Sequence, residues 1–141
     1  AQTERLVSLM APLHRARLET IARSGRRAVG AVYRRTRLEN GHRTQRAEVR
    51  FDGLAGCLRT PRGGSSRQSL LIVDDGRVCS RLLSAREAAR LMGLPDSYRL
   101  PRPATAALHL AGDGVCAPVV RWLSQELLEP LLSEKSVLAA E

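Results

Sequence analysis

Residues 59–68 have the sequence RTPRGGSSRQ, which combines many hydrogen-bond donors with an unusually free backbone. The ten residues include three arginines, two serines and two glycines, and none of them is acidic. Two apolar runs flank the stretch, LAGCL before it and SLLIV after it. The stretch is therefore either a solvated hairpin loop or a loop that binds an anionic group, and the rest of the chain has to distinguish the two.

The other residue types that carry chemistry are scattered. The three cysteines lie far apart without a Cys-x-x-Cys spacing, so neither a disulfide framework nor a zinc site is predicted. The three histidines have no metal-ligand spacing either, and we expect no bound metal. These residues are Cys57, Cys79, Cys116, His14, His42 and His109.

Positive charge is concentrated in the first part of the chain. Of the 23 basic residues 22 are arginines, and the formal net charge is +9. Residues 1–50 hold twelve arginines and four glutamates, whereas residues 101–141 hold three basic and five acidic residues. This asymmetry indicates one face for a polyanion and another for packing, although a solvated basic surface has the same composition.

Length and hydropathy limit the class of protein. A chain of 141 residues can form one domain with a modest core, and with 3% aromatic residues that core must consist of Leu, Val and Ala. No apolar run approaches the ~20 residues that span a bilayer, and the N-terminus lacks the layout of a signal peptide. We expect a soluble, cytoplasmic protein of prokaryotic type.

The first half of the chain is predicted to contain a helical segment and a small antiparallel β unit. Apolar residues recur with helical period over 3–23, and Pro12 divides this segment into two short helices. Asn40-Gly41 and Asp75-Gly76 are signals for tight turns. Strands are expected at about 28–38, 44–51, 54–59, 69–74 and 77–81.

A helix over about 85–92 has clear signals at both ends. Ser84 and Glu87 have the spacing of a capping box, which marks its start. Gly93 at the C′ position and Pro95 just beyond it mark its end.

The remainder of the chain is predicted to hold a linker and one more helix. Residues 99–108 are expected to be irregular, because three of their positions are unfavourable in a helix. The last helix is expected over about 116–128 with an apolar stripe. Trp122 beside the stripe fits the core or a subunit interface, and Pro130 ends or kinks the helix.

The segment RLLSAREAARLMGLPDSY, residues 81–98, resembles the ninth motif of DNA cytosine-5 methyltransferases. That motif reads Arg-x-Leu-Thr/Ser-x-Arg-Glu-x-x-Arg-Leu-x-Gly-Phe/Tyr/Leu-Pro-Asp. The resemblance implies a structural role, in which the charged side chains form ion pairs that organise the neighbouring recognition region. The matching positions are Arg81, Leu83, Ser84, Arg86, Glu87, Arg90, Leu91, Gly93, Pro95 and Asp96.

The segment AGDGVCAPVVRWL, residues 111–123, resembles the tenth motif of the same family, usually Gly-Asn-Ser/Ala-Val-x-x-x-Val. The resemblance implies that its turn completes a pocket for S-adenosylmethionine. Two positions depart from the motif, since Asp113 replaces Asn and Gly114 replaces Ser or Ala. Aspartate can accept a hydrogen bond or pair with the ammonium group of the cofactor, but it cannot donate as asparagine does. The candidate cofactor-binding residues are Gly112, Asp113, Gly114 and Val115.

Residues 51–73 are similar to the end of the family's target-recognition region, where a threonine-containing strand leads into a glycine-rich loop. The resemblance implies that this loop enters the major groove of DNA, with arginine on guanine or phosphate, glutamine on adenine and serine on phosphate. Upstream, Tyr33, Arg35 and Arg37 share one strand face, which is either a phosphate-contacting ribbon or a solvated surface. The candidate DNA-binding residues are Arg59, Thr60, Arg62, Gly63, Gly64, Ser65, Ser66, Arg67, Gln68, Arg35 and Arg37.

The chain lacks the segments that carry the family's chemistry. No cysteine follows a proline, and the glycine-rich cofactor loop, the Glu-Asn-Val segment and the Gln-x-Arg-x-Arg stretch are missing from the sequence. Because the family's thiolate attacks C6 of a flipped cytosine, this chain by itself is predicted to be inactive. The resemblance covers roughly residues 44–132 and implies the C-terminal third of a methyltransferase, cut from a longer enzyme or present as the small subunit of a split one.

Three functions remain open on this basis. The first is the DNA-recognition and cofactor-closing part of a cytosine-5 methyltransferase, with double-stranded DNA and a catalytic portion as partners. The second is a free-standing DNA-binding module, and the third is a structural module whose apolar faces bind a partner. The tenth-motif turn favours the first function, because a pure DNA reader does not need a cofactor-side segment.

The predicted fold class is α+β. A small, mostly antiparallel β unit would be flanked by an N-terminal helical segment and by C-terminal helices that pack on a missing Rossmann-like catalytic domain. The expected division is a target-recognition region at 1–80 (helical lead-in 3–23, β unit 28–81), the ninth-motif helix at 81–98, and the linker, tenth motif and last helix at 99–141.

Overall fold

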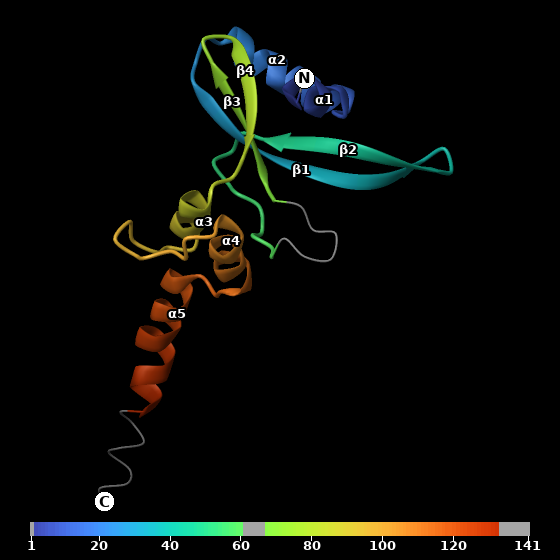
Figure 1. Ribbon diagram of the computed structural model, residues 1–141. Coiled ribbons are helices and arrows are strands. Elements are labelled where there is room, and N and C mark those ends of the chain that lie inside the picture. The colour runs from blue at the N-terminus through green and yellow to red at the C-terminus, as the bar shows by residue number, and fades with distance from the viewer. Residues whose placement is uncertain (1, 61–66, 133–141) are drawn as a thin grey trace, which may run out of the picture. The chain divides into compact units, whose positions relative to one another are not determined.

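The computed structural model describes residues 2–60 and 67–132 of the chain, which divides into two compact units (Figure 1). The first unit comprises residues 1–58 and 66–83, and the second comprises residues 59–65 and 84–141. The class is α+β, with helices and an antiparallel sheet, as predicted.

Two short helices begin the first unit. Helix α1 spans Gln2–Ser8 and helix α2 spans Pro12–Arg23. Pro12 separates them as predicted, because it lies in the first turn of α2, where its missing N–H is not needed. The chain turns out of α2 at Ser24 and at Gly25, whose φ is +66°.

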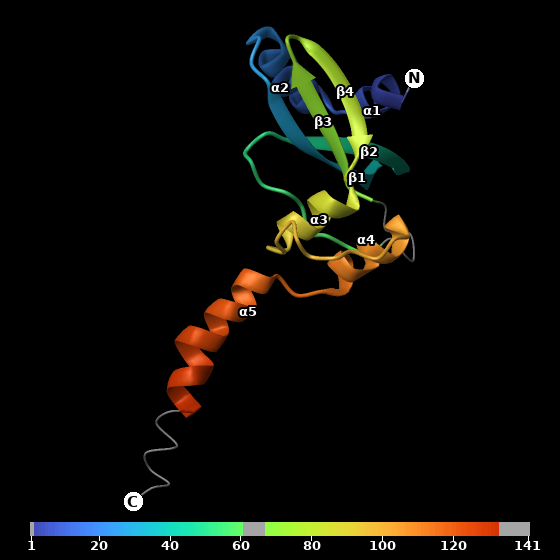
Figure 2. The same cartoon turned by 60° about the vertical axis from the view of Figure 1, so that its left-hand side comes forward.

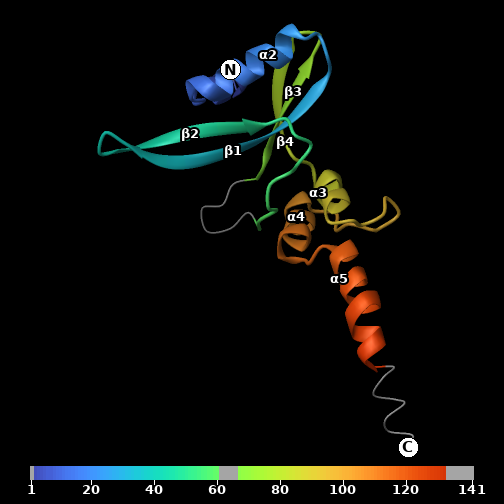
Figure 3. The ribbon, with the colours of Figure 1, turned by 180° about the vertical axis from the view of Figure 1, so that it is seen from behind.

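A four-stranded antiparallel sheet of order β2-β1-β3-β4 completes the first unit. Asn40, Gly41, Asp75 and Gly76 all have positive φ, as type I′ hairpin turns require, so both predicted hairpins are confirmed. The β1–β2 hairpin is long, and its tip projects beyond β3 and β4 (Figures 1 and 3). The strands are β1 Ala28–Glu39, β2 His42–Arg50, β3 Ser69–Asp74 and β4 Arg77–Leu82.

Helices α1 and α2 pack on one face of this sheet (Figures 2 and 3). Met10, between the helices, makes a parallel bridge to Ala47, whose N–H donates to Leu9 O at 3.0 Å. The enclosed core is aliphatic, as the scarcity of aromatic residues predicted. Its buried members are Leu6, Met10, Leu18, Val32, Ala47, Val49, Leu71 and Val73.

The strand predicted at 54–59 is wrong, because these residues pair with no strand in the described structure. Gly53 has a φ of +76°, which turns the chain after β2. Gly56 then lies against the ring of Tyr33, so that a Cβ at Gly56 would come within 2.1 Å of Tyr33 Cε1. The segment therefore crosses the face of β1 rather than extending the sheet at an edge.

The second unit contains helices α3, α4 and α5. Helix α3 spans Ala85–Leu91, as predicted, and α4 spans Ala104–Asp113. The prediction of an irregular linker at 99–108 is therefore wrong for the residues after Pro103, which are helical. The unfavourable prolines precede the helix, Pro103 is its N-cap, and the alanine-rich segment that follows has high helix propensity.

The last helix begins as predicted but does not end at Pro130. Helix α5 spans Ala117–Leu123, a π-helical segment follows at Ser124–Leu128, and the chain stays helical through residue 132. The N–H of Glu129 donates to Ser124 O across this wider turn, which lies where a proline ring would otherwise crowd the preceding carbonyl. Among the helices that the structure describes, none combines the length and the hydropathy that a membrane crossing requires.

Candidate functional site

The start of the arginine-rich loop is fixed to the end of α4. Thr60 Oγ1 donates a hydrogen bond to Asp113 Oδ1. A Cβ at Gly112 would lie 2.4 Å from Thr60 N and 2.7 Å from the carbonyl carbon of Arg59, so only glycine allows this approach. The side chain of Arg59 is exposed. A predicted DNA-binding residue and a predicted cofactor-side residue therefore meet, although 53 positions separate them in the sequence.

The end of the same loop is held by the strands of the first unit. Leu83 N–H donates to Gln68 O at 2.8 Å, and Arg67 Nη2 donates to Leu83 O at 3.0 Å. Arg67 Nε and both amide atoms of Gln68 are buried and have no hydrogen-bond partner among the residues that the structure describes. Both side chains are thus turned into the protein in this structure.

The centre of the predicted loop lies outside the described residues. It comprises Arg62, Gly63, Gly64, Ser65 and Ser66.

The tenth-motif turn is open to solvent on the second unit. Asp113, Gly114 and Val115 are all exposed, and the side chain of Val115 is 71% exposed. Gly114 N–H donates to Leu110 O, which closes α4. A Cβ at Gly114 would lie 2.9 Å from the same oxygen, so a larger residue would crowd this turn.

The ninth-motif residues build a compact cap around α3. The predicted capping box is confirmed, because Ser84 Oγ accepts from Glu87 N–H at 3.2 Å while Ser84 N–H donates to Glu87 Oε2 at 2.9 Å. Arg86 Nη2 donates to Tyr98 O at 2.9 Å and Nη1 to Pro95 O at 3.5 Å, so it holds the chain that follows α3.

Arg90 binds Asp96 in a bidentate pair, with Nε to Oδ1 at 2.7 Å and Nη2 to Oδ2 at 2.9 Å. These hydrogen bonds from Arg90 lower the pKa of the Asp96 carboxyl. In the preceding strand, Arg81 Nη1 donates to Leu82 O at 3.3 Å.

The C-terminus of α3 contacts the N-terminus of α5. Gly93 has a φ of +75°, and a Cβ there would lie 2.2 Å from Pro118 Cδ. Ala117 N–H donates to Met92 O at 2.9 Å. The ninth and tenth motifs are therefore joined directly, beside the loop contact between Thr60 and Asp113.

The face of β1 that carries Tyr33, Arg35 and Arg37 is an ion-paired surface. Arg37 Nε donates to Glu48 Oε1 at 3.1 Å, and Arg35 Nε lies 3.6 Å from Glu48 Oε2. Arg35 also lies over the Tyr33 ring, with Cζ 5.9 Å from its centroid. Two arginines thus share one carboxylate on β2.

Two more carboxylates neutralise the same face. Arg46 Nε donates to Glu39 Oε1 at 2.8 Å, and Arg50 Nε donates to Asp52 Oδ2 at 3.0 Å. These hydrogen bonds lower the pKa of both carboxyl groups. The sequence alone does not predict this pairing, because it depends on the register of β1 and β2.

Among the described residues, no three His, Cys, Asp or Glu side chains gather in a way that could hold a metal ion.

Comparison with known proteins identifies the family to which this sequence is similar. The sequence model of the family described as C-5 cytosine-specific DNA methylase matches residues 14–129. The type II methyltransferase M.HpaII of Haemophilus parainfluenzae is 30% identical over 95 aligned positions, which cover 57% of this chain and 26% of the relative. No solved structure matches the chain.

Two relatives come from Neisseria lactamica. The type II methyltransferase M.NlaIV is 36% identical over 64 residues, which cover 45% of this chain and 15% of the relative. M.NlaX is 38% identical over 47 residues, which cover 33% of this chain and 15% of the relative. The chain thus spans about a quarter or less of the length of these curated relatives.

Proposed function

Because the chain belongs to the C-5 cytosine-specific DNA methylase family, we propose that it is the DNA-recognition and cofactor-closing part of a DNA (cytosine-5) methyltransferase. Such an enzyme transfers a methyl group from S-adenosylmethionine to C5 of a flipped cytosine. The thiolate nucleophile belongs to a catalytic portion that this sequence does not contain. Alone, the chain binds and positions but does not transfer methyl groups.

The contact between Thr60 and Asp113 carries this proposal. It fixes one end of the candidate DNA-reading loop to the turn that would border the cofactor, and Gly112 brings the two backbones together. Methyl transfer needs the target base and the methyl donor held at a defined separation, since orientation supplies a large part of the rate. A rigid joint between these two segments serves that need.

The tenth-motif turn fits one wall of a cofactor pocket. Asp113 Oδ1 accepts from Thr60, and the second carboxylate oxygen is left to pair with the ammonium group of the cofactor. The exposed Val115 side chain offers apolar surface beside it. S-adenosylmethionine would supply the electrophilic methyl group, while Asp113 and Val115 bind and orient the molecule.

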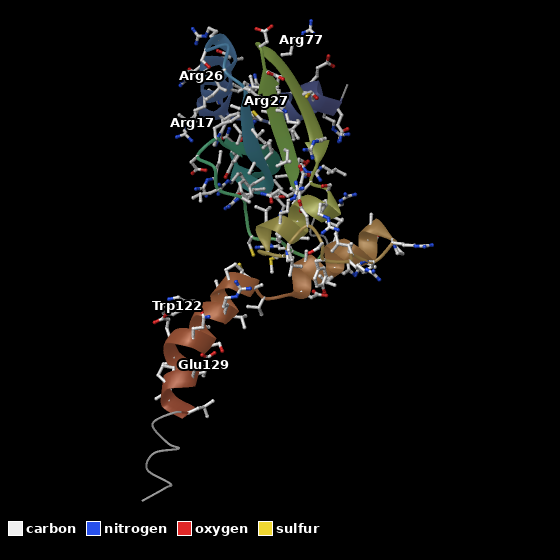
Figure 4. The ribbon with its side chains drawn as sticks, turned by 90° about the vertical axis from the view of Figure 1, so that its left-hand side faces the viewer. Arg17, Arg26, Arg27, Arg77, Trp122 and Glu129 are labelled. Carbon is white, nitrogen blue, oxygen red and sulfur yellow. The ribbon has the colours of Figure 1, made fainter. Side chains whose placement is uncertain are left out.

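The last helix supports a catalytic portion as the partner. Its apolar side chains are exposed on more than one side, and Trp122, labelled in Figure 4, is 61% exposed, which favours a subunit interface over the core, the two positions expected for it. Exposed apolar surface of this extent marks an interaction site. The helix therefore docks onto the part of the enzyme that this sequence lacks. Its exposed apolar residues are Val119, Val120, Trp122, Leu123, Leu127, Leu128, Leu131 and Leu132.

Site selection from a randomised duplex pool tests the DNA-reading role of the loop. Arg59→Gln and Arg62→Gln are compared with Arg77→Gln, an exposed arginine at the start of β4 (Figure 4). Loss of a bidentate contact to guanine relaxes preference at one base pair by about 1–3 kcal/mol. The control keeps the preference of the unmodified chain. Unchanged preference in both loop variants would refute the role of the loop.

The identity of the whole enzyme is tested by purifying the native protein and determining by mass what accompanies residue 1. A continuous or co-purifying segment with a Pro-Cys nucleophile and a glycine-rich cofactor loop supports the methyltransferase. A lone 141-residue chain that binds duplex DNA would instead establish a free-standing recognition module.

A further inference from the structure

A basic groove in the first unit is lined by residues of α1, of the segment after it and of all four strands. Its volume is about 190 Å³, which exceeds that of several waters at ~30 Å³ each. Arg5, Arg34 and Arg81 line it, with Ser69 and Ser80. No carboxylate is among its described lining residues.

The two faces of the β1–β2 hairpin differ in their charge balance. On one face every arginine named above has a carboxylate partner, with Glu48 shared by Arg35 and Arg37. On the groove face, neither Arg5 nor Arg34 has a carboxylate oxygen within 4.0 Å among the described residues. Uncompensated guanidinium groups around one groove are stabilised by an anion, and their fork geometry matches phosphate oxygens.

The groove also lies next to the end of the candidate DNA-reading loop. Ser69 lines the groove and directly follows Gln68, the last residue of that loop. Ser80 Oγ, on the adjacent β4, shares a hydrogen bond of 3.0 Å with Thr3 Oγ1 of α1. This hydrogen bond connects the helix to the strands beside the groove. A duplex that contacts the loop would therefore pass close to the groove.

We propose that this groove binds a backbone phosphate of the DNA duplex through Arg5 and Arg34. The inference rests on the proposed DNA-recognition function and extends it to the N-terminal helix, outside the loop. The contact is independent of sequence, because phosphate contacts position the protein whereas base contacts specify the site. Its ligand is a diester phosphate rather than free inorganic phosphate.

The test measures duplex affinity of the 141-residue chain by fluorescence anisotropy over a series of salt concentrations. The double variant Arg5→Gln/Arg34→Gln is compared with Arg17→Gln/Arg26→Gln. The two control arginines are exposed at the other end of the first unit (Figure 4). Their substitution removes the same charge as the groove variant. Loss of the single phosphate contact that the two arginines share lowers the slope of log affinity against log salt by about one. The controls change the slope by less than half that amount.

The outcomes separate this inference from the proposed function. If the unmodified chain binds no duplex at the lowest salt, both are overturned. If it binds, but the groove variant and the control variant behave alike, the groove assignment fails and DNA recognition stands. A loss confined to one base sequence also overturns the assignment, because a phosphate contact weakens all sequences equally.

A second arm titrates inorganic phosphate and follows the backbone amides of Ser69 and Ser80 by NMR. The expected result is weak binding that the groove variant abolishes, together with the altered salt slope for duplex DNA. Phosphate binding without any effect of the variant on DNA affinity assigns the groove to a free phosphate and overturns the proposal.

Discussion

Gly112→Ala tests whether residues 59–60 pack against the end of α4, because the packing decides whether the substitution stabilises or destabilises the chain. Gly112 lies in the last turn of α4 without a positive φ. Alanine would therefore stabilise an isolated helix by up to about 1 kcal/mol. In the folded chain the new Cβ would lie 2.4 Å from Thr60 N and 2.8 Å from Thr60 Cα. Both contacts are with backbone, which cannot give way as the end of a side chain can.

The steric cost of placing a Cβ against Thr60 exceeds the gain in helix propensity from glycine to alanine. Overpacking costs about 1–3 kcal/mol, and loss of the bond from Thr60 to Asp113 adds about 1 kcal/mol. We expect a net destabilisation of about 1–3 kcal/mol, measured by denaturant unfolding. Hydrogen exchange at Thr60 and along α4 should increase together, because the segment lifts away from the helix.

Ala106→Gly on the exposed side of the same helix provides the calibration. Because Ala106 is exposed, the substitution should destabilise by about 1 kcal/mol through helix propensity alone. If Gly112→Ala instead stabilises the chain by an amount comparable to the loss in the control, residues 59–60 do not pack on α4 in solution. The joint that carries the proposed function would then be refuted.

Two other predictions concern α3 and its surroundings. Ser84→Ala removes the capping hydroxyl and should lower the free energy of unfolding by about 1 kcal/mol, whereas Ser84→Asp should retain most of it, as measured by circular dichroism in denaturant. Because Arg90 lowers the pKa of Asp96, the contribution of this pair is fully present above the pKa of an unfolded aspartate and is lost as the pH falls through the lowered value. Asp96→Asn should therefore destabilise the chain at neutral pH and lose that effect in acid, and an equal effect at both pH values would contradict the ion pair.

Local signals made several elements predictable. The turns at Asn40-Gly41 and Asp75-Gly76, and the ends of α3 at Ser84 and Gly93, each depend on residues within a few positions of one another. Helix α4 was missed because the prolines before it obscured its start. The strand at 54–59 was mispredicted because pairing depends on a free partner edge, and Gly56 instead lies on Tyr33.

The candidate site was predictable as a set of residues but not as an arrangement. The loop at 59–68 and the turn at 112–115 were both singled out from the sequence, yet their contact joins positions 53 residues apart. The sharing of Glu48 by two arginines likewise depends on strand register. The roles proposed for these residues in DNA and cofactor binding stay predictions.

Because the end of α3 contacts the start of α5, residues 94–116 form a connection whose two ends lie side by side. The N–H of Ala117 donates to Met92 O, and Pro118 packs against Gly93, so direct contacts hold the two ends of this segment together. The length of the chain between the ends therefore does not determine where they lie. Doubling a flexible connection costs only about 0.6 kcal/mol in closure entropy. Residues inserted at 99–102, between Tyr98 and α4, should thus leave the ninth and tenth motifs in register. The distance in sequence between the two motifs is therefore not fixed by their contact, and we expect this stretch to accept an engineered tag or domain.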